Sequence, residues 1–178
     1  MSKYIKKIFK IILKNLIVMD YYLVLQLKKI YLNMSYTIKH LFHIKSPIDD
    51  VFDALTDIKK LQKWYTTETS GESKLNGNIN FRFGEIDFKI QIIEYEKNMK
   101  ITWECVDTTL DALIGQKYTY ELDENADKTR VRYSQSAFED QDDFYANMNY
   151  SVGKYLESLR QFCQSGISEG FGSDGYRT

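Results

Sequence analysis

The residues best suited to catalysis or metal binding are few in this chain, and their spacing does not bring them together. His40 and His43 lie three residues apart in a segment that alternates like a strand, so their side chains point to opposite faces and cannot ligate one metal ion. Cys105 and Cys163 lack the spacing of a metal site or redox pair and are interpreted as small buried residues. We therefore expect no catalytic residue, no metal site and no cofactor, and a protein that is not an enzyme.

Two acidic runs come closest to a cation site. Residues 123–127 begin with the spacing of a calcium loop, but Lys128 stands where the tight turn of that loop needs glycine, so the run predicts a hairpin turn. Residues 139–143 hold four acidic side chains at the start of a predicted helix. Their simplest role is to stabilise the positive end of that helix, and a metal or a basic partner is the alternative.

A stronger signal comes from large side chains that recur along the predicted strands and the last helix. Aromatic residues make up 15% of the chain, and buried rings either fill a core or line a pocket for an apolar ligand. In the second case, tyrosine hydroxyls and a glutamine amide would supply the few polar contacts that such pockets contain. The candidate cavity-lining residues are Trp64, Phe81, Phe83, Phe88, Trp103, Tyr118, Tyr120, Tyr133, Gln135, Met148 and Tyr155.

The chain of 178 residues is long enough to bury one core without disulfides. Its 24 basic and 25 acidic residues almost cancel, which argues against a nucleic-acid-binding protein. The charge is unevenly divided: residues 1–33 carry seven lysines and one aspartate, whereas residues 34–178 carry 17 basic and 24 acidic groups. Two cysteines without a pairing pattern favour a reducing, cytoplasmic location.

Residues 1–36 are predicted to be a basic extension outside the domain. Their apolar stretch, residues 16–27, is too short and too polar to span a membrane, and no small-residue cleavage site of a signal peptide precedes Met34. Translation from Met34 would leave this extension out of the native protein. The alternative is an amphipathic helix in residues 1–33 that makes weak peripheral contact with an anionic membrane surface.

From residue 37 onward, apolar periodicity predicts a strand, two short helices, a run of strands and a long helix. Ser46 is expected to cap the first helix, Asp57 the second, and Gly166 to follow the last. Residues 167–178 are rich in glycine, show no apolar period and are predicted to be a disordered tail. The strands are expected around residues 38–44, 79–83, 88–92, 101–105, 118–122 and 131–135, and the helices from 47, from 57 to 65 and from 142 to 164.

A sheet with one apolar face must be covered, and the last helix is the only predicted element long enough to cover it. The predicted fold class is therefore α+β, with a curved antiparallel sheet wrapped around a long C-terminal helix and two short helices after the first strand. This domain is expected to span residues 37–166. If the sheet curls around the helix, a space remains between them.

Several short residue patterns are spread over the predicted domain, among them Ser46-Pro47-x4-Phe52, Leu61-x2-Trp64, Gly77-x3-Phe81-x-Phe83, Tyr118-x-Tyr120-Glu121-Leu122 and Gly153-x-Tyr155-Leu156-x2-Leu159. With the order of the predicted elements, they resemble the helix-grip fold of the START-like superfamily, also called SRPBCC or birch-pollen-allergen-like. More narrowly, the residues are similar to the family of the C-terminal domain of the activator of heat-shock protein 90 ATPase. Lys154 departs from the aromatic residue common in that family, and residues 1–33 cannot replace the long N-terminal domain of the eukaryotic activator.

The resemblance implies a fold rather than one activity, because members of the family include chaperone regulators and binders of lipids or other hydrophobic molecules. Together with the aromatic residues, it favours a non-enzymatic domain that binds a small hydrophobic molecule or lipid between the sheet and the last helix. The first alternative is a protein-interaction module or chaperone co-regulator. The second is an enzyme, which would need a polar pair such as His40 with Glu94, or Tyr118 with Gln135, to meet in one cavity.

Overall fold

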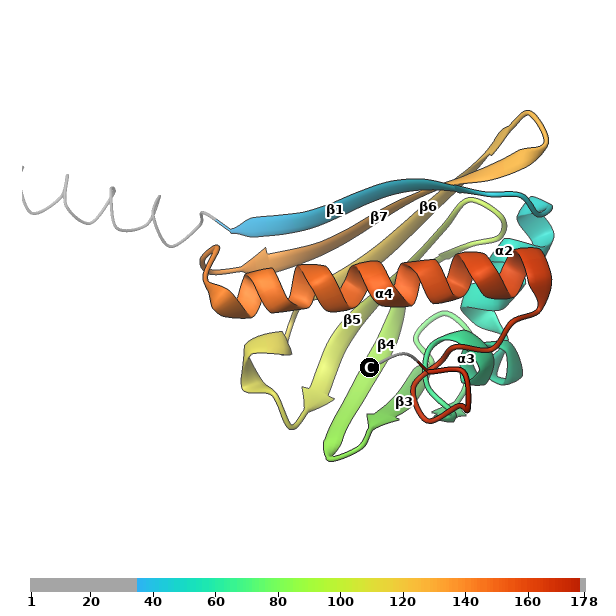
Figure 1. Ribbon diagram of the computed structural model, residues 1–178. Coiled ribbons are helices and arrows are strands. Elements are labelled where there is room, and N and C mark those ends of the chain that lie inside the picture. Colours follow the sequence, from blue (N-terminus) through green and yellow to red (C-terminus); the bar gives the residue numbers. More distant parts are fainter. Residues whose placement is uncertain (1–34, 177–178) are drawn as a thin grey trace, which may run out of the picture. The chain divides into compact units, whose positions relative to one another are not determined.

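The computed structural model describes residues 35–176, which form one antiparallel sheet of seven strands and three α-helices (Figure 1). The strand order is β1-β7-β6-β5-β4-β3-β2, so the chain meanders from β2 to β7 and β1 pairs with β7. This architecture confirms the predicted α+β helix-grip fold. The elements are β1 (Tyr36–Ile44), α2 (Ile48–Thr56), α3 (Ile58–Trp64), β2 (Glu68–Gly71), β3 (Asn78–Phe83), β4 (Ile86–Glu96), β5 (Lys100–Thr108), the 3-10 helix η1 (Asp111–Leu113), β6 (Lys117–Asn125), β7 (Lys128–Phe138) and α4 (Asp143–Ser165).

The sheet has one apolar face because buried residues recur at every second position of its strands. On β4, Phe88, Ile90 and Ile92 are buried, and the side chains between them are more exposed. Figure 1 shows α4 running across this sheet. All the predicted strands are present. The strand β2 and the helix η1 were not predicted, because four residues without apolar alternation and a three-residue turn carry no periodic signal.

Two of the three expected helix boundaries are confirmed. The Asp57 carboxylate accepts a hydrogen bond from the Lys60 backbone N–H at 3.0 Å and caps α3, and Gly166 ends α4 in the left-handed conformation with φ 71°. The expected cap of α2 is wrong. Pro47, rather than Ser46, occupies the N-cap position, and no side chain caps this helix. The fixed φ of proline still directs the chain into the helix.

Trp64 connects the three helices. Its indole Nε1 donates a hydrogen bond to the carbonyl oxygen of Ala54 on α2 at 2.7 Å. Its own carbonyl oxygen accepts a hydrogen bond from the Ser158 hydroxyl on α4, also at 2.7 Å. Both bonds are buried, where a hydrogen bond fixes geometry firmly because an unpaired polar group would be costly.

The two halves of α4 pack differently. The C-terminal half buries Leu156, Ser158 and Leu159, whereas Phe144 and Met148, near the N-terminal end, are only partly buried. The helix is therefore anchored at its C-terminal half, and its N-terminal half stands over less densely packed space.

Residues 167–176, here called the C-terminal segment, fold back onto α3 and the loop that follows it. The prediction of a disordered tail is wrong for these residues. Gly170 N–H donates to the carbonyl oxygen of Lys63 at 3.0 Å, Phe171 N–H to that of Tyr65 at 2.9 Å, and Thr67 N–H to that of Phe171 at 2.9 Å. Such backbone pairing holds a segment in place as a strand edge does. Of the predicted extension, residues 1–36, the first 34 lie outside the described residues, and Tyr36 is already the first residue of β1.

The glycines of the C-terminal segment permit this contact instead of making the chain flexible. A Cβ atom at Gly170 would lie 2.9 Å from the carbonyl oxygen of Lys63, which is closer than real Cβ contacts allow. At Gly172, φ is +81° and a Cβ atom would lie 2.5 Å from the Thr67 hydroxyl oxygen. Glycine content alone therefore predicted the opposite of the observed structure.

Replacing Phe171 with alanine tests the packing of the C-terminal segment. The Phe171 ring lies 5.7 Å from the Phe83 ring and 5.1 Å from the Tyr176 ring, and it is half-buried. We expect Phe171→Ala to lower the free energy of unfolding by about 1–2 kcal/mol, less than for a fully buried ring. Ile167→Ala is the control, since that side chain is 46% exposed and its loss should cost under about 0.5 kcal/mol. Equal, negligible changes in urea unfolding would contradict the packing.

Candidate functional site

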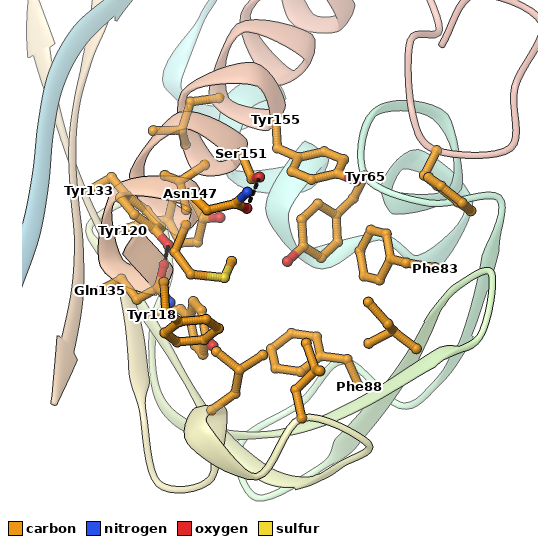
Figure 2. Close-up of a pocket in the computed structure, with 18 of the residues that line it drawn as sticks. Tyr65, Phe83, Phe88, Tyr118, Tyr120, Tyr133, Gln135, Asn147, Ser151 and Tyr155 are labelled. Atoms are coloured by element: carbon orange, nitrogen blue, oxygen red, sulfur yellow. Dashed lines mark hydrogen bonds between the residues drawn. The ribbon is translucent and has the colours of Figure 1, made fainter. Parts of the chain in front are cut away.

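A cavity of about 350 Å³ lies between α4 and the inner face of the sheet (Figure 2). Its walls come from the strands β3, β4, β6 and β7, from η1 and the residues beside it, from α4, from the end of α3 and from the C-terminal segment. The meander places these strands in one sheet, and α4 lies over them. Phe144 and Met148, near the N-terminal end of α4, are only partly buried.

Eight of the eleven candidate residues line this cavity, and three lie in the filled core. Trp64, Phe81 and Trp103 are at most 2% exposed and do not reach the cavity. Tyr65 explains the difference, because its ring packs 4.8 Å from the Phe81 ring and 6.1 Å from the Trp103 ring while it also lines the cavity. The residues that do line the cavity are Phe83, Phe88, Tyr118, Tyr120, Tyr133, Gln135, Met148 and Tyr155.

The cavity has further walls that were not among the candidates. Phe144, Val152 and Leu156 belong to the predicted apolar stripe of the last helix and could have been included on that signal. Phe171 and Tyr176 could not, because nothing in their local sequence predicts that the C-terminal segment folds back. The other unpredicted lining residues are Tyr65, Ile86, Leu110, Leu113, Asn147 and Ser151.

A buried polar network stands at the sheet side of the cavity. The Tyr133 hydroxyl donates to Gln135 Oε1 at 3.2 Å, and Gln135 Nε2 donates to Gln116 Oε1 at 2.7 Å. Gln116 Oε1 also accepts from the Tyr118 hydroxyl at 3.4 Å, and its Nε2 donates to the carbonyl oxygen of Ala112 at 3.2 Å. The chain of bonds fixes the orientation of the Gln135 amide in a site where an unpaired amide would be costly.

Two tyrosine hydroxyls in the cavity have no such partner. Figure 2 shows the Tyr65 hydroxyl pointing into the open space, and within residues 35–176 neither it nor the Tyr120 hydroxyl makes a hydrogen bond. Burial raises the pKa of Tyr65, Tyr118 and Tyr133 well above the usual value for tyrosine, and neighbouring tyrosines add to this effect. These hydroxyls are therefore neutral donors and acceptors at physiological pH.

The residues considered for catalysis do not meet at the cavity, with one exception. His40 Nε2 lies 3.0 Å from Asn149 Oδ1, and Glu94 is bound to Lys100 at 2.8 Å, so His40 and Glu94 are engaged elsewhere and neither lines the cavity. Tyr118 and Gln135 do converge there, joined through Gln116.

In the part of the chain that the structure covers, no group of three or more His, Cys, Asp or Glu side chains could hold a metal ion. Of the helices between residues 35 and 176, none has the length and apolar character needed to cross a bilayer.

The C-terminal end of the chain contains two glycine patterns that elsewhere mark active sites. Residues 166–170 match Gly-x-Ser-x-Gly, the hydrolase nucleophile pattern, and residues 170–175 match Gly-x-Gly-x-x-Gly. Each motif requires a preceding strand and a following helix, but both runs here come after α4 and open no helix. The Ser168 hydroxyl donates to the carbonyl oxygen of Lys63 at 2.7 Å. The residues of both patterns therefore help to hold the C-terminal segment against α3 and do not form an active site.

Both cysteines are free, in keeping with their interpretation as small apolar residues. Burial raises the pKa of the Cys105 thiol to about 11 and that of Cys163 to about 12. Since the thiolate is the nucleophile, both side chains are weak nucleophiles at neutral pH.

The buried tyrosines predict a loss of stability at alkaline pH. Above pH 10 the tyrosines of the unfolded chain lose their protons, whereas Tyr65, Tyr118 and Tyr133 in the folded chain keep theirs. Raising the pH therefore lowers the free energy of the unfolded state relative to that of the folded state. Each group lowers the free energy of unfolding by up to about 1.4 kcal/mol per pH unit. Urea unfolding at pH 8, 10 and 11 should show this decline, and Tyr65→Phe should make it shallower. Constant stability up to pH 11 would contradict the burial of these hydroxyls.

Comparison with known proteins agrees with the fold and the predicted resemblance. The family model described as "Activator of Hsp90 ATPase homolog 1-like protein" matches residues 45–164. The solution structure of the Aha1 dimer from Colwellia psychrerythraea is 25% identical, with 74% of this chain and 98% of that chain covered and a TM-score of 0.69. The crystal structure of SSP2350 from Staphylococcus saprophyticus is 20% identical, covers 75% and 95% of the two chains, and has a TM-score of 0.63.

A more distant structural relative is CalU16 from Micromonospora echinospora, whose crystal structure is 18% identical, with 74% of this chain and 78% of that chain covered and a TM-score of 0.60. A search of curated proteins gave no significant match. The family model covers well over half of the chain, including both short helices, the strands β2 to β7 and nearly all of α4. The chain therefore belongs to the Activator of Hsp90 ATPase homolog 1-like family.

Proposed function

We propose that this chain is a non-enzymatic domain that binds a small hydrophobic molecule in the cavity between α4 and the sheet. The observation that supports this most directly is the cavity itself, whose volume of about 350 Å³ falls within the range of ligand sites. Protein interiors are packed densely enough that voids larger than a water molecule are few. A cavity of this volume is therefore larger than the voids found in an ordinary protein core.

The composition of the walls supports the same proposal. Rings and aliphatic side chains make up most of the surface, and the polar groups are a few tyrosine hydroxyls, the Gln135 amide and the side chains of Asn147 and Ser151. Sites for small molecules combine a mainly apolar surface with a few polar groups that set orientation. A catalytic role has less support, since no charged base or nucleophile lines the cavity among the residues described.

A second function, interaction with a chaperone of the Hsp90 class, is favoured by family membership and by the 25% identity to the Aha1 structure. It is tested by titrating the chain into an Hsp90 ATPase assay, where a rise in rate would support it and an unchanged rate would remove it. A cytoplasmic location is part of the proposal for either function, because both cysteines are free.

Filling the cavity with a larger side chain tests ligand binding. N-phenyl-1-naphthylamine is an uncharged dye that fluoresces in apolar surroundings, and we expect it to bind the wild-type chain. Met148 lines the cavity, so Met148→Trp should weaken binding by at least about tenfold while the chain stays folded. Tyr150→Trp is the matched control, because Tyr150 is on the same helix, is 69% exposed and does not line the cavity. Equal affinity of both variants, or no binding by the wild type, would reject the proposal.

A further inference from the structure

The walls of the cavity contain no charged side chain. Nineteen described residues line it, and none is Asp, Glu, Lys, Arg or His. Transfer of an isolated charge from water into such surroundings is strongly unfavourable unless a partner neutralises it. A carboxylate or phosphate group inside this cavity would find no cation among the described lining residues. The charged head groups of fatty acids and phospholipids are therefore poor occupants of the interior of the cavity.

Aromatic rings form opposite sides of the cavity. Ten of the nineteen lining residues are Phe or Tyr. Figure 2 shows Tyr65, Phe83 and Tyr155 on one side, and their rings lie 5.1–5.5 Å apart in edge-to-face contacts. Tyr118 lies across the space from them, with its ring 5.3 Å from that of Phe88. Aromatic surfaces attract other rings in stacked or edge-to-face geometry beyond the effect of buried area, which favours a flat aromatic guest over an acyl chain.

Unused hydrogen-bonding groups mark where a polar atom of the guest would lie. The Tyr65 hydroxyl points into the space without a partner among residues 35–176. Gln135 Nε2 carries two hydrogens, and the network within the protein uses one of them, in the bond to Gln116. A guest oxygen that accepted a hydrogen bond from either donor would satisfy a group that the protein leaves open.

We propose that the cavity selects an uncharged, flat aromatic molecule of two or three fused rings that carries one hydroxyl or carbonyl oxygen. The Tyr65 hydroxyl donates to the oxygen, and the surrounding rings hold the aromatic body. The volume of about 350 Å³, near the lower end for ligand sites, limits the guest to this size. This inference rests on the proposed ligand-binding function.

The test is a calorimetric titration at pH 7 with five probes: naphthalene, 2-naphthol, 2-naphthoate, 1-decanol and decanoate. We expect 2-naphthol to bind about fivefold more tightly than naphthalene, and at least about tenfold more tightly than 2-naphthoate or decanoate. If decanol or either carboxylate binds as tightly as 2-naphthol, the cavity takes hydrophobic ligands but the inferred class is wrong. If no probe binds, the proposed function fails and the inference falls with it.

Removal of one hydroxyl tests the polar contact. Tyr65→Phe deletes a hydroxyl that bonds to no other described residue, so it should leave folding unchanged and reduce the preference for 2-naphthol over naphthalene to within about twofold. Tyr95→Phe, on β4 and outside the cavity, is the matched control and should keep the full preference. Retention of the full preference in Tyr65→Phe would overturn the assignment of Tyr65.

Discussion

The structure depends on one requirement: the single apolar face of a seven-stranded sheet must be shielded from water, and α4 is the only described element long enough to span it. The helix meets that requirement unevenly. Its C-terminal half is fixed by buried Leu156 and Leu159 and by the bond from Ser158 to Trp64, whereas Phe144 and Met148 near its N-terminal end are only partly buried. The cavity is therefore a consequence of how the cover is attached.

Much of the fold and part of the site could be predicted from the sequence, for identifiable reasons. Period-two alternation determines which face a strand residue occupies, so Phe88, Tyr118 and Gln135 were placed correctly on the inner face. Alternation does not determine which part of that face is covered. Phe81 and Trp103 share the inner face, but Tyr65, which follows α3 directly, packs over them, and no local pattern carries that information.

The largest error concerns the C-terminal segment, and it has a clear physical origin. Glycine indicates flexibility when it is read by composition, but at Gly170 and Gly172 the absence of a side chain is what allows the backbone to approach α3 and the loop after it. Gln116 was missed for a related reason. It precedes β6 in an irregular stretch, and its role as the hub of the buried network appears only when Tyr118 and Gln135 are brought beside it.

The central claim is that an apolar guest occupies the space under the N-terminal half of α4, and methionine methyl NMR tests it most directly. Met148 lines the cavity, whereas Met99, in the turn between β4 and β5, is 61% exposed and does not line the cavity. On saturation with N-phenyl-1-naphthylamine, the ring current of the guest should shift the Met148 methyl signal and leave that of Met99 in place. An unmoved Met148 signal at saturation, or a shift confined to Met99, would contradict the account.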